Sequence, residues 1–126
     1  MAITKKKILI IEDEKPMARA LEIKLTHAGF AAKAVFNGEE GVGLFQKENF
    51  DLIILDLVMP KLDGFKVLEA LKEKKIKTPV IVLTNLGQPE DEKRARELGA
   101  VGFFIKSNTP IAEIVERVSS AFSDNQ

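Results

Sequence analysis

The stretch DLIILD, residues 51–56, contains a run of four branched apolar residues that ends on an acid. Three other short runs have the same form, and a polar residue follows each of them: KILII (7–11), VIVL (80–83) and GFFI (102–105). Short, uninterrupted apolar runs are typical of strands that are buried on both faces of a parallel sheet. The four runs together therefore predict such a sheet.

Helix-like spacing alternates with these runs along the chain. Apolar residues recur at helical intervals within 17–28, 42–45, 65–71, 89–98 and 111–122. A weaker apolar stretch at 31–36 carries Lys33, which suits a strand at the edge of a sheet. Five strands that alternate with five helices predict an α/β fold, a doubly wound parallel sheet with right-handed crossovers.

The expected helix at about 89–98 differs from the others in its charge. Every residue from Glu90 to Arg94 is charged, and only Ala95 and Leu98 can face a core. Helices in proteins depend on packing more than on intrinsic propensity. We therefore expect this helix to be the most weakly held of the five.

Length, charge and composition limit the possible functions. The chain has 126 residues, 19 Lys and Arg, 19 Asp and Glu, and no cysteine. We expect one domain over 1–126, with its core at about 6–122. No basic excess indicates binding to nucleic acid or to an anionic membrane, and disulfides and thiolate metal sites are excluded. The N-terminus lacks the apolar segment of a signal peptide and no run could span a bilayer, so we expect a cytoplasmic protein.

Carboxylates follow two of the apolar runs. Glu12 and Asp13 come after the run 7–11, and Asp56 ends the run that begins at Leu52. Parallel strands end at one edge of the sheet, which is where open α/β folds have their sites. Carboxylates about 4 Å apart repel by roughly 1 kcal/mol in bulk water and by about 4 kcal/mol at an effective dielectric of 20. Three of them either raise one another's pKa or hold a cation, and oxygen ligands without His or Cys favour Mg²⁺.

Thr84 and Lys106 follow the other two runs. Taken singly, such residues have ordinary explanations, because Asp and Thr after a strand often cap a turn or helix and Lys often points to solvent. Taken as a set, they match the needs of phosphoryl transfer to a carboxylate. Asp56 can form an aspartyl phosphate, while an ammonium and a hydroxyl stabilise the phosphoryl oxygens. The set therefore predicts a phosphoryl acceptor.

The chain resembles the receiver domain of bacterial two-component response regulators over essentially its whole length. The matching segments are ILIIEDE (8–14), DLIILDLVMP (51–60), DG (63–64), VLT (82–84), GA (99–100) and FIK (104–106). The resemblance implies a flavodoxin-like strand order, 2-1-3-4-5, of which the chemotaxis regulator is an example. It also implies that Asp56 is the phosphoacceptor. Asp13 and Asp56 would ligate Mg²⁺ directly, Glu12 through water, and Val58 through its backbone carbonyl.

The same resemblance implies a switch and a set of partners. Thr84 and Lys106 would engage the phosphoryl group, and Phe103 would be the aromatic switch residue that moves inward as Thr84 turns toward the phosphate. The donor would be the phosphohistidine of a sensor histidine kinase or phosphotransfer protein. The output would be a changed face made by the fourth helix, fifth strand and last helix, read by a partner protein or by a second copy. Such a protein promotes its own phosphorylation and dephosphorylation and is not a turnover enzyme, and it contacts no nucleic acid or membrane directly.

Several positions depart from the usual pattern of that family. Ser107 replaces a proline that usually follows a cis bond, and a cis bond before a non-proline residue costs about 3–4 kcal/mol. Asn85 replaces a small residue, and Phe103 lacks the hydroxyl of the frequent tyrosine. Val101 and Gly102 stand where many DNA-binding regulators carry acids of a dimer salt-bridge network. That type of dimer is therefore not expected.

Three other functions compete with a phosphorylated receiver. A haloacid-dehalogenase-like phosphatase needs an aspartate two residues after its nucleophile, where this chain has Val58. In a flavodoxin-like electron carrier, the acids at 12–14 would repel the flavin phosphate. A pseudo-receiver that binds partners without phosphorylation is the remaining alternative, and the full set of acids, hydroxyl and ammonium argues against it.

Two further patterns have simpler explanations. GEEGVG (38–43) looks like a glycine-rich phosphate loop, but its spacing is wrong and it contains acids, so we expect the start of a helix. The lysine-rich segment 72–77 is expected to be the solvated end of a helix.

Overall fold

The computed structural model describes residues 5–123 and forms one five-stranded parallel sheet. The strand order is β2-β1-β3-β4-β5, which confirms the predicted fold class. The strands are β1 (Lys7–Ile11), β2 (Ala31–Val35), β3 (Leu52–Leu55), β4 (Val80–Thr84) and β5 (Ala100–Ile105). The helices are α1 (Lys15–His27), α2 (Gly38–Lys47), α3 (Gly64–Glu73), α4 (Pro89–Glu97) and α5 (Ile111–Ser123), with a 3-10 turn at Lys106–Asn108.

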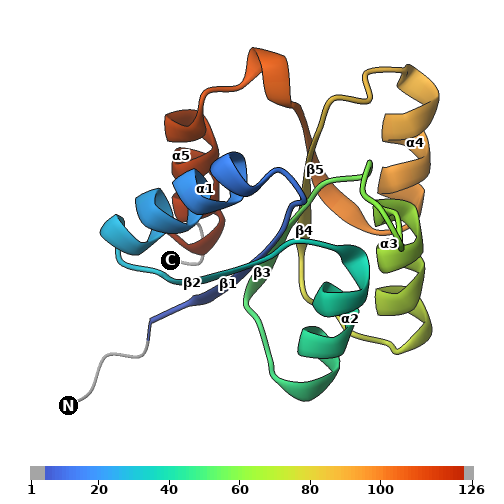
Figure 1. Ribbon diagram of the computed structural model, residues 1–126, viewed down its shortest axis with the longest axis horizontal. Coiled ribbons are helices and arrows are strands. Elements are labelled where there is room, and N and C mark those ends of the chain that lie inside the picture. The colour runs from blue at the N-terminus through green and yellow to red at the C-terminus, as the bar shows by residue number, and fades with distance from the viewer. Residues whose placement is uncertain (1–4, 124–126) are drawn as a thin grey trace.

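The helices cover both faces of the sheet, with α1 and α5 on one face and α2, α3 and α4 on the other (Figure 1). Side chains alternate between the faces, so Ile8 and Ile10 of β1 belong to the core under α1 and α5. Leu9 and Ile11 belong to the core under α2, α3 and α4. Burial of both faces explains why β3 and nearly all of β1, β4 and β5 are apolar, whereas the edge strand β2 is more exposed and carries Lys33.

Short polar side chains cap the N-termini of two helices. The side chain of Asn37 accepts a hydrogen bond from the Glu40 N–H (2.9 Å) at the start of α2. Asp63 does the same for the Lys66 N–H (3.0 Å) at the start of α3. Such caps satisfy amide donors that have no partner within a helix. No helix of the described part of the chain is long and apolar enough to cross a membrane.

Helix α4 has little apolar contact with the sheet, as its sequence predicts. Ala95 is its one buried residue. The Arg94 guanidinium adds a contact to α3, 4.1 Å from the centre of the Phe65 ring and 3.8 Å from a Glu69 carboxylate oxygen. Exposed pairs of this kind contribute at most about 1 kcal/mol. Helix α4 is therefore weakly held, by the packing of Ala95 and by a few exposed contacts of small energy.

The glycines of α2 lie where the helix approaches its neighbours closely. A Cβ atom on Gly38 would overlap the Leu62 carbonyl oxygen, and one on Gly41 would overlap the Ile11 side chain. A Cβ atom on Gly43 would meet nothing within 4 Å. The first two glycines serve packing, as expected for a helix start, and the third has no such role.

Gly43→Ala should therefore raise the free energy of unfolding by about 1 kcal/mol, because alanine is the better helix former by that amount. Gly38→Ala should lower it, because the Leu62 backbone must move. Urea unfolding of the two variants beside the wild type measures both effects. A Gly38→Ala protein as stable as Gly43→Ala would contradict the packing explanation.

Candidate functional site

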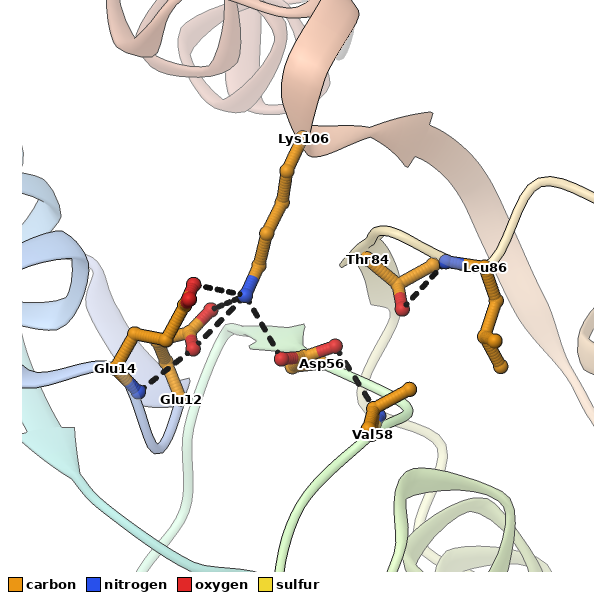
Figure 2. A network of polar contacts seen from close by, with 7 residues as sticks. All are labelled: Glu12, Glu14, Asp56, Val58, Thr84, Leu86 and Lys106. Atoms are coloured by element: carbon orange, nitrogen blue, oxygen red, sulfur yellow. Dashed lines mark hydrogen bonds and ion pairs between the residues drawn. The ribbon is translucent and has the colours of Figure 1, made fainter.

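The ends of four strands bring the predicted polar residues to one edge of the sheet (Figure 2). Glu12 and Asp13 follow β1, and Asp56 follows β3. Thr84 is the last residue of β4, and Lys106 is the first residue after β5. Because all the strands are parallel, their carboxyl ends meet here.

Lys106 lies at the centre of a network of three carboxylates. Its Nζ atom is 2.8 Å from Glu12 Oε1, 2.7 Å from Glu14 Oε1 and 2.8 Å from Asp56 Oδ2. Only 6% of the Lys106 side chain is exposed, so its ammonium group faces the site and not solvent. Glu14 was not predicted as a site residue, and the signal that could have found it is its position directly after Glu12 and Asp13.

Both carboxylate oxygens of Asp56 are engaged. Oδ1 accepts a hydrogen bond from the Val58 N–H (3.2 Å), and Oδ2 accepts one from Lys106. The following loop is held close to α3, because a Cβ atom on Gly64 would overlap the Asp56 carbonyl oxygen and the Gly64 N–H bonds to the Leu57 carbonyl (3.0 Å). Asp56 is thus buried and fixed in one orientation.

Asp13 differs from the other acids because, among the described residues, its side chain has no hydrogen-bond or ion-pair partner. Glu12, Asp13 and Asp56 each place a carboxylate oxygen within 4.8 Å of the others. With Glu14, four carboxylates face the single ammonium group of Lys106. This excess of negative charge and the purely oxygen ligand set fit a divalent cation such as Mg²⁺.

The cluster shifts the titration of two of its members. Burial is the largest influence on the Glu12 carboxyl group and raises its pKa to about 7, although hydrogen bonds from Lys106 and from the Glu14 N–H oppose this. Burial alone would lower the pKa of Lys106. Hydrogen bonds to Asp56, Glu12 and Glu14 outweigh that effect and raise it above its usual range. Lys106 therefore stays charged at neutral pH.

A cavity of about 230 Å³ opens beside these groups. It is lined by Asp13, Glu14, Asp56, Val58, Asn85, Leu86 and Lys106. Its walls therefore combine the charged cluster with two apolar side chains. The cavity is large enough for a phosphoryl group, and Asp56 forms part of its wall.

Thr84 and Phe103 lie outside the charged network. Thr84 is fully buried, and its Oγ1 atom accepts a hydrogen bond from the Leu86 N–H (3.3 Å). Phe103 is partly buried against the core under α2, α3 and α4 and does not line the cavity. The structure thus brings the acids and Lys106 together, with Thr84 nearby (Figure 2), and leaves Phe103 among core residues.

The loop after Lys106 has no cis peptide bond. All peptide bonds between the described residues are trans, including the bond between Lys106 and Ser107. Lys106 nevertheless reaches Asp56, and the Thr109 hydroxyl closes the turn through a hydrogen bond to the Ile105 carbonyl (2.9 Å). A proline at this position is therefore not needed to place the ammonium group.

Comparison with known proteins gives a consistent result. The family model of the response regulator receiver domain matches residues 8–119. A probable transcriptional regulator, ycf27, of Porphyridium aerugineum is 38% identical over 127 aligned residues, covering 96% of this chain and 52% of the relative. The transcriptional regulatory protein PcoR of Escherichia coli is 39% identical, covering 89% of this chain and 49% of the relative. The chain thus spans about half the length of these relatives.

Solved structures with the same fold include other proteins of this kind. The receiver domain of the Francisella response regulator 1452 has a TM-score of 0.89 and 30% identity, with 97% of this chain and 100% of that chain covered. The Vibrio cholerae chemotaxis protein CheY4 has a TM-score of 0.84 and 25% identity, with 92% and 98% covered.

Asp13→Asn and Lys106→Met should change the stability of the metal-free protein in opposite directions. Neutralising Asp13 removes repulsion between carboxylates and should raise the free energy of unfolding by about 1 kcal/mol. Lys106→Met keeps a long side chain but leaves buried Glu12 and Asp56 without their counter-ion, which typically costs about 3 kcal/mol. Urea unfolding in EDTA measures both changes.

Lys93→Met on exposed α4 is the matched control and should change stability by less than about 0.5 kcal/mol. If Asp13→Asn destabilised the protein as much as Lys106→Met, the cluster would not carry an excess of negative charge.

Proposed function

The chain belongs to the family of response regulator receiver domains, and from that premise we propose that Asp56 accepts a phosphoryl group from a phosphohistidine donor in the presence of Mg²⁺. The observation that carries this proposal is the contact between Asp56 and Lys106. Asp56 Oδ2 lies 2.8 Å from Lys106 Nζ beside a cavity that can admit the donor group. Glu14 also contacts Lys106 and lines this cavity, but its side chain is 55% exposed, whereas Asp56 is buried at the end of a strand.

In the proposed reaction, an oxygen of the Asp56 carboxylate attacks the phosphorus atom of the donor. An O–P bond forms while the P–N bond of the phosphohistidine breaks, and the electron pair leaves with the imidazole nitrogen. With an acyl phosphate, a P–O bond breaks instead and the donor carboxylate leaves. The product is an aspartyl phosphate.

Lys106 and Thr84 would stabilise the transferred group. Lys106 can exchange its hydrogen bond with Asp56 for one with a phosphoryl oxygen, because Glu12 and Glu14 still hold the ammonium group nearby. The Thr84 hydroxyl now accepts a hydrogen bond from the Leu86 N–H and has its own proton to donate to another phosphoryl oxygen. Positioned donors of this kind supply most of the catalysis in phosphoryl transfer.

Glu12, Asp13, Asp56 and the backbone carbonyl of Val58 would hold the Mg²⁺ ion. When bound, the ion neutralises charge that develops on the phosphoryl oxygens. The close approach of three carboxylates supports this assignment, as does the side chain of Asp13, which has no partner among residues 5–123. Because one ammonium group cannot balance four acids, a divalent cation also removes repulsion within the cluster.

We assign the output to the face made by α4, β5 and α5, which a partner protein or a second copy would read. Helix α4 has one buried residue, Ala95, and the loop before it carries Asn85 and Leu86 on the wall of the cavity. Movement of Thr84 toward the phosphate, with Phe103 moving inward, would therefore reach α4 directly. We place the protein in the cytoplasm, with a sensor kinase or phosphotransfer protein as donor, and regard it as a phosphoacceptor and not as a turnover enzyme.

Incubation with Mg²⁺ and acetyl phosphate should add one phosphoryl group to the wild type, because Asp56 is the buried acid that both contacts Lys106 and lines the cavity. Asp56→Asn should gain none, and EDTA should prevent labelling of the wild type. Intact-mass spectrometry measures the product. Equal labelling of Asp56→Asn would refute the assignment of Asp56, and an unlabelled wild type would favour a receiver that binds partners without phosphorylation.

The phosphorylated protein should lose its phosphate slowly, because the cavity walls at Val58 and Leu86 cannot orient an attacking water by hydrogen bonding. A Val58→Asn, Leu86→Glu double variant should dephosphorylate roughly tenfold faster, which corresponds to about 1.4 kcal/mol of the barrier. The decay of the phosphorylated mass over time gives both rates. Val101→Asn, at an exposed valine outside the cavity, is the control, and equal rates in all three proteins would mean that these walls do not set the lifetime.

A further inference from the structure

A second cavity, of about 340 Å³, lies at the opposite edge of the sheet from the acidic site. It is formed by the ends of α3 and α4 and by the starts of β4 and β5. Its apolar wall includes Leu71, Ile76, Leu98 and Val101. Val101 is 60% exposed, which is unusual for a valine at the start of a strand in an otherwise buried sheet. This cavity thus presents apolar surface that no described part of the chain covers.

Lysines surround this apolar wall. Lys72, Lys75 and Lys77 line the cavity, and Lys74 lies between them in the sequence. None of these four lysines has an ion-pair partner within the described residues.

Three other basic side chains on the same two helices are paired, with Lys66 and Arg94 near Glu69 and Arg96 near Glu92. Glu97 is the one acid among the residues that line the cavity. The lysine rim therefore carries uncompensated positive charge.

One of these lysines has a backbone conformation that disfavours a side chain. Lys75 has φ 58° at the position just past the end of α3. Glycine occupies the corresponding position after two other helices, with Gly29 at φ 101° after α1 and Gly99 at φ 111° after α4. Glycine is the favoured residue at such positions. Lys75 thus adds a positive charge to the rim where glycine would fit the backbone better.

We propose that this cavity is a docking site for a short acidic segment of a partner protein. An apolar side chain of the segment would enter the cavity, and its carboxylates would pair with Lys72, Lys75 and Lys77. Charge complementarity supports a segment of this chemistry, because three lysines distributed along the rim match carboxylates that are distributed along a peptide. An apolar anchor inside a ring of polar contacts is also the usual composition of a protein interface. The site does not involve Asp56, so the proposal stands apart from phosphoryl transfer.

The test uses the unphosphorylated protein labelled with ¹⁵N and the synthetic peptide acetyl-Glu-Asp-Leu-Phe-Asp-Glu-amide. Saturable shifts of amide signals within 71–79 and 97–101 are expected at low salt. Lys72→Glu with Lys77→Glu should weaken binding at least tenfold, which is about 1.4 kcal/mol. Lys15→Glu with Lys24→Glu on α1, which covers the other face of the sheet, changes the net charge by the same amount. This double variant is the control and should leave the affinity unchanged.

Lys75→Gly separates docking from folding. This substitution should weaken peptide binding severalfold, because it removes one lysine of the rim. The urea midpoint should stay unchanged or rise, because glycine adopts the left-handed backbone conformation without strain. Val101→Ser should also weaken peptide binding, because it removes part of the apolar wall. The protein should remain folded, because the Val101 side chain is largely exposed. A Lys75→Gly protein that binds as tightly as the wild type would count against the lysine rim.

Other occupants of the cavity would overturn the proposal. If a peptide with serine in place of Leu and Phe bound equally well, binding would depend on charge attraction alone and not on an apolar anchor. Laurate that shifts the same amide signals and displaces the peptide would identify a fatty-acid site. Shifts of these signals on raising the protein concentration alone would identify contact with a second copy. No shift at these residues with the acidic peptide would exclude the site.

Discussion

The ion pairs of Lys106 with buried carboxylates are the interaction on which the acidic edge depends. Glu12 is 2% exposed and Asp56 is 4% exposed, and a buried carboxylate without a partner is strongly unfavourable. Lys106 comes from the far end of β5, so this contact joins the first, third and fifth strands at one point. It makes a group of acids compatible with a folded protein and keeps them close enough to bind a cation.

The sheet itself explains why the polar groups of the site lie at the ends of strands. Helices cover both faces, so every residue of β3 and β4 is buried and Thr84, at the end of β4, is the one polar member of the two strands. Acids within the strands would have no partner. At the carboxyl ends the chain leaves the core, and backbone donors such as the Val58 N–H become available to the Asp56 carboxylate. The apolar core and the polar site are thus two results of one topology.

Much of this arrangement could be predicted from the sequence. The four apolar runs and the helical spacing predicted the fold, and the acids, Thr84 and Lys106 were predicted as the site residues. The contact of Glu14 with Lys106 was not predicted. Glu14 precedes α1 and Lys106 follows β5, and the sequence does not show that these two side chains point toward each other. The lysines at 72–77 were expected at a solvated helix end. They also border an apolar cavity, since α4 and the start of β5, distant in sequence, form its other wall.

Strand β4 and the segment that continues from it through α4 each extend from one cavity to the other. Strand β4 begins with Val80 on the wall of the lysine-rimmed cavity and ends with Thr84 beside the acidic one. The segment after β4 carries Leu86 on the wall of the acidic cavity, and α4 then runs back to Leu98 on the wall of the other. Strand β4 is fully buried and cannot move without disturbing the core, whereas α4 has one buried residue.

A shift of α4 is therefore the least costly way for one cavity to affect the other. Coupling between two sites is reciprocal. A partner docked at the lysine rim would thus change the phosphorylation equilibrium only to the extent that it binds one position of α4 more tightly than another.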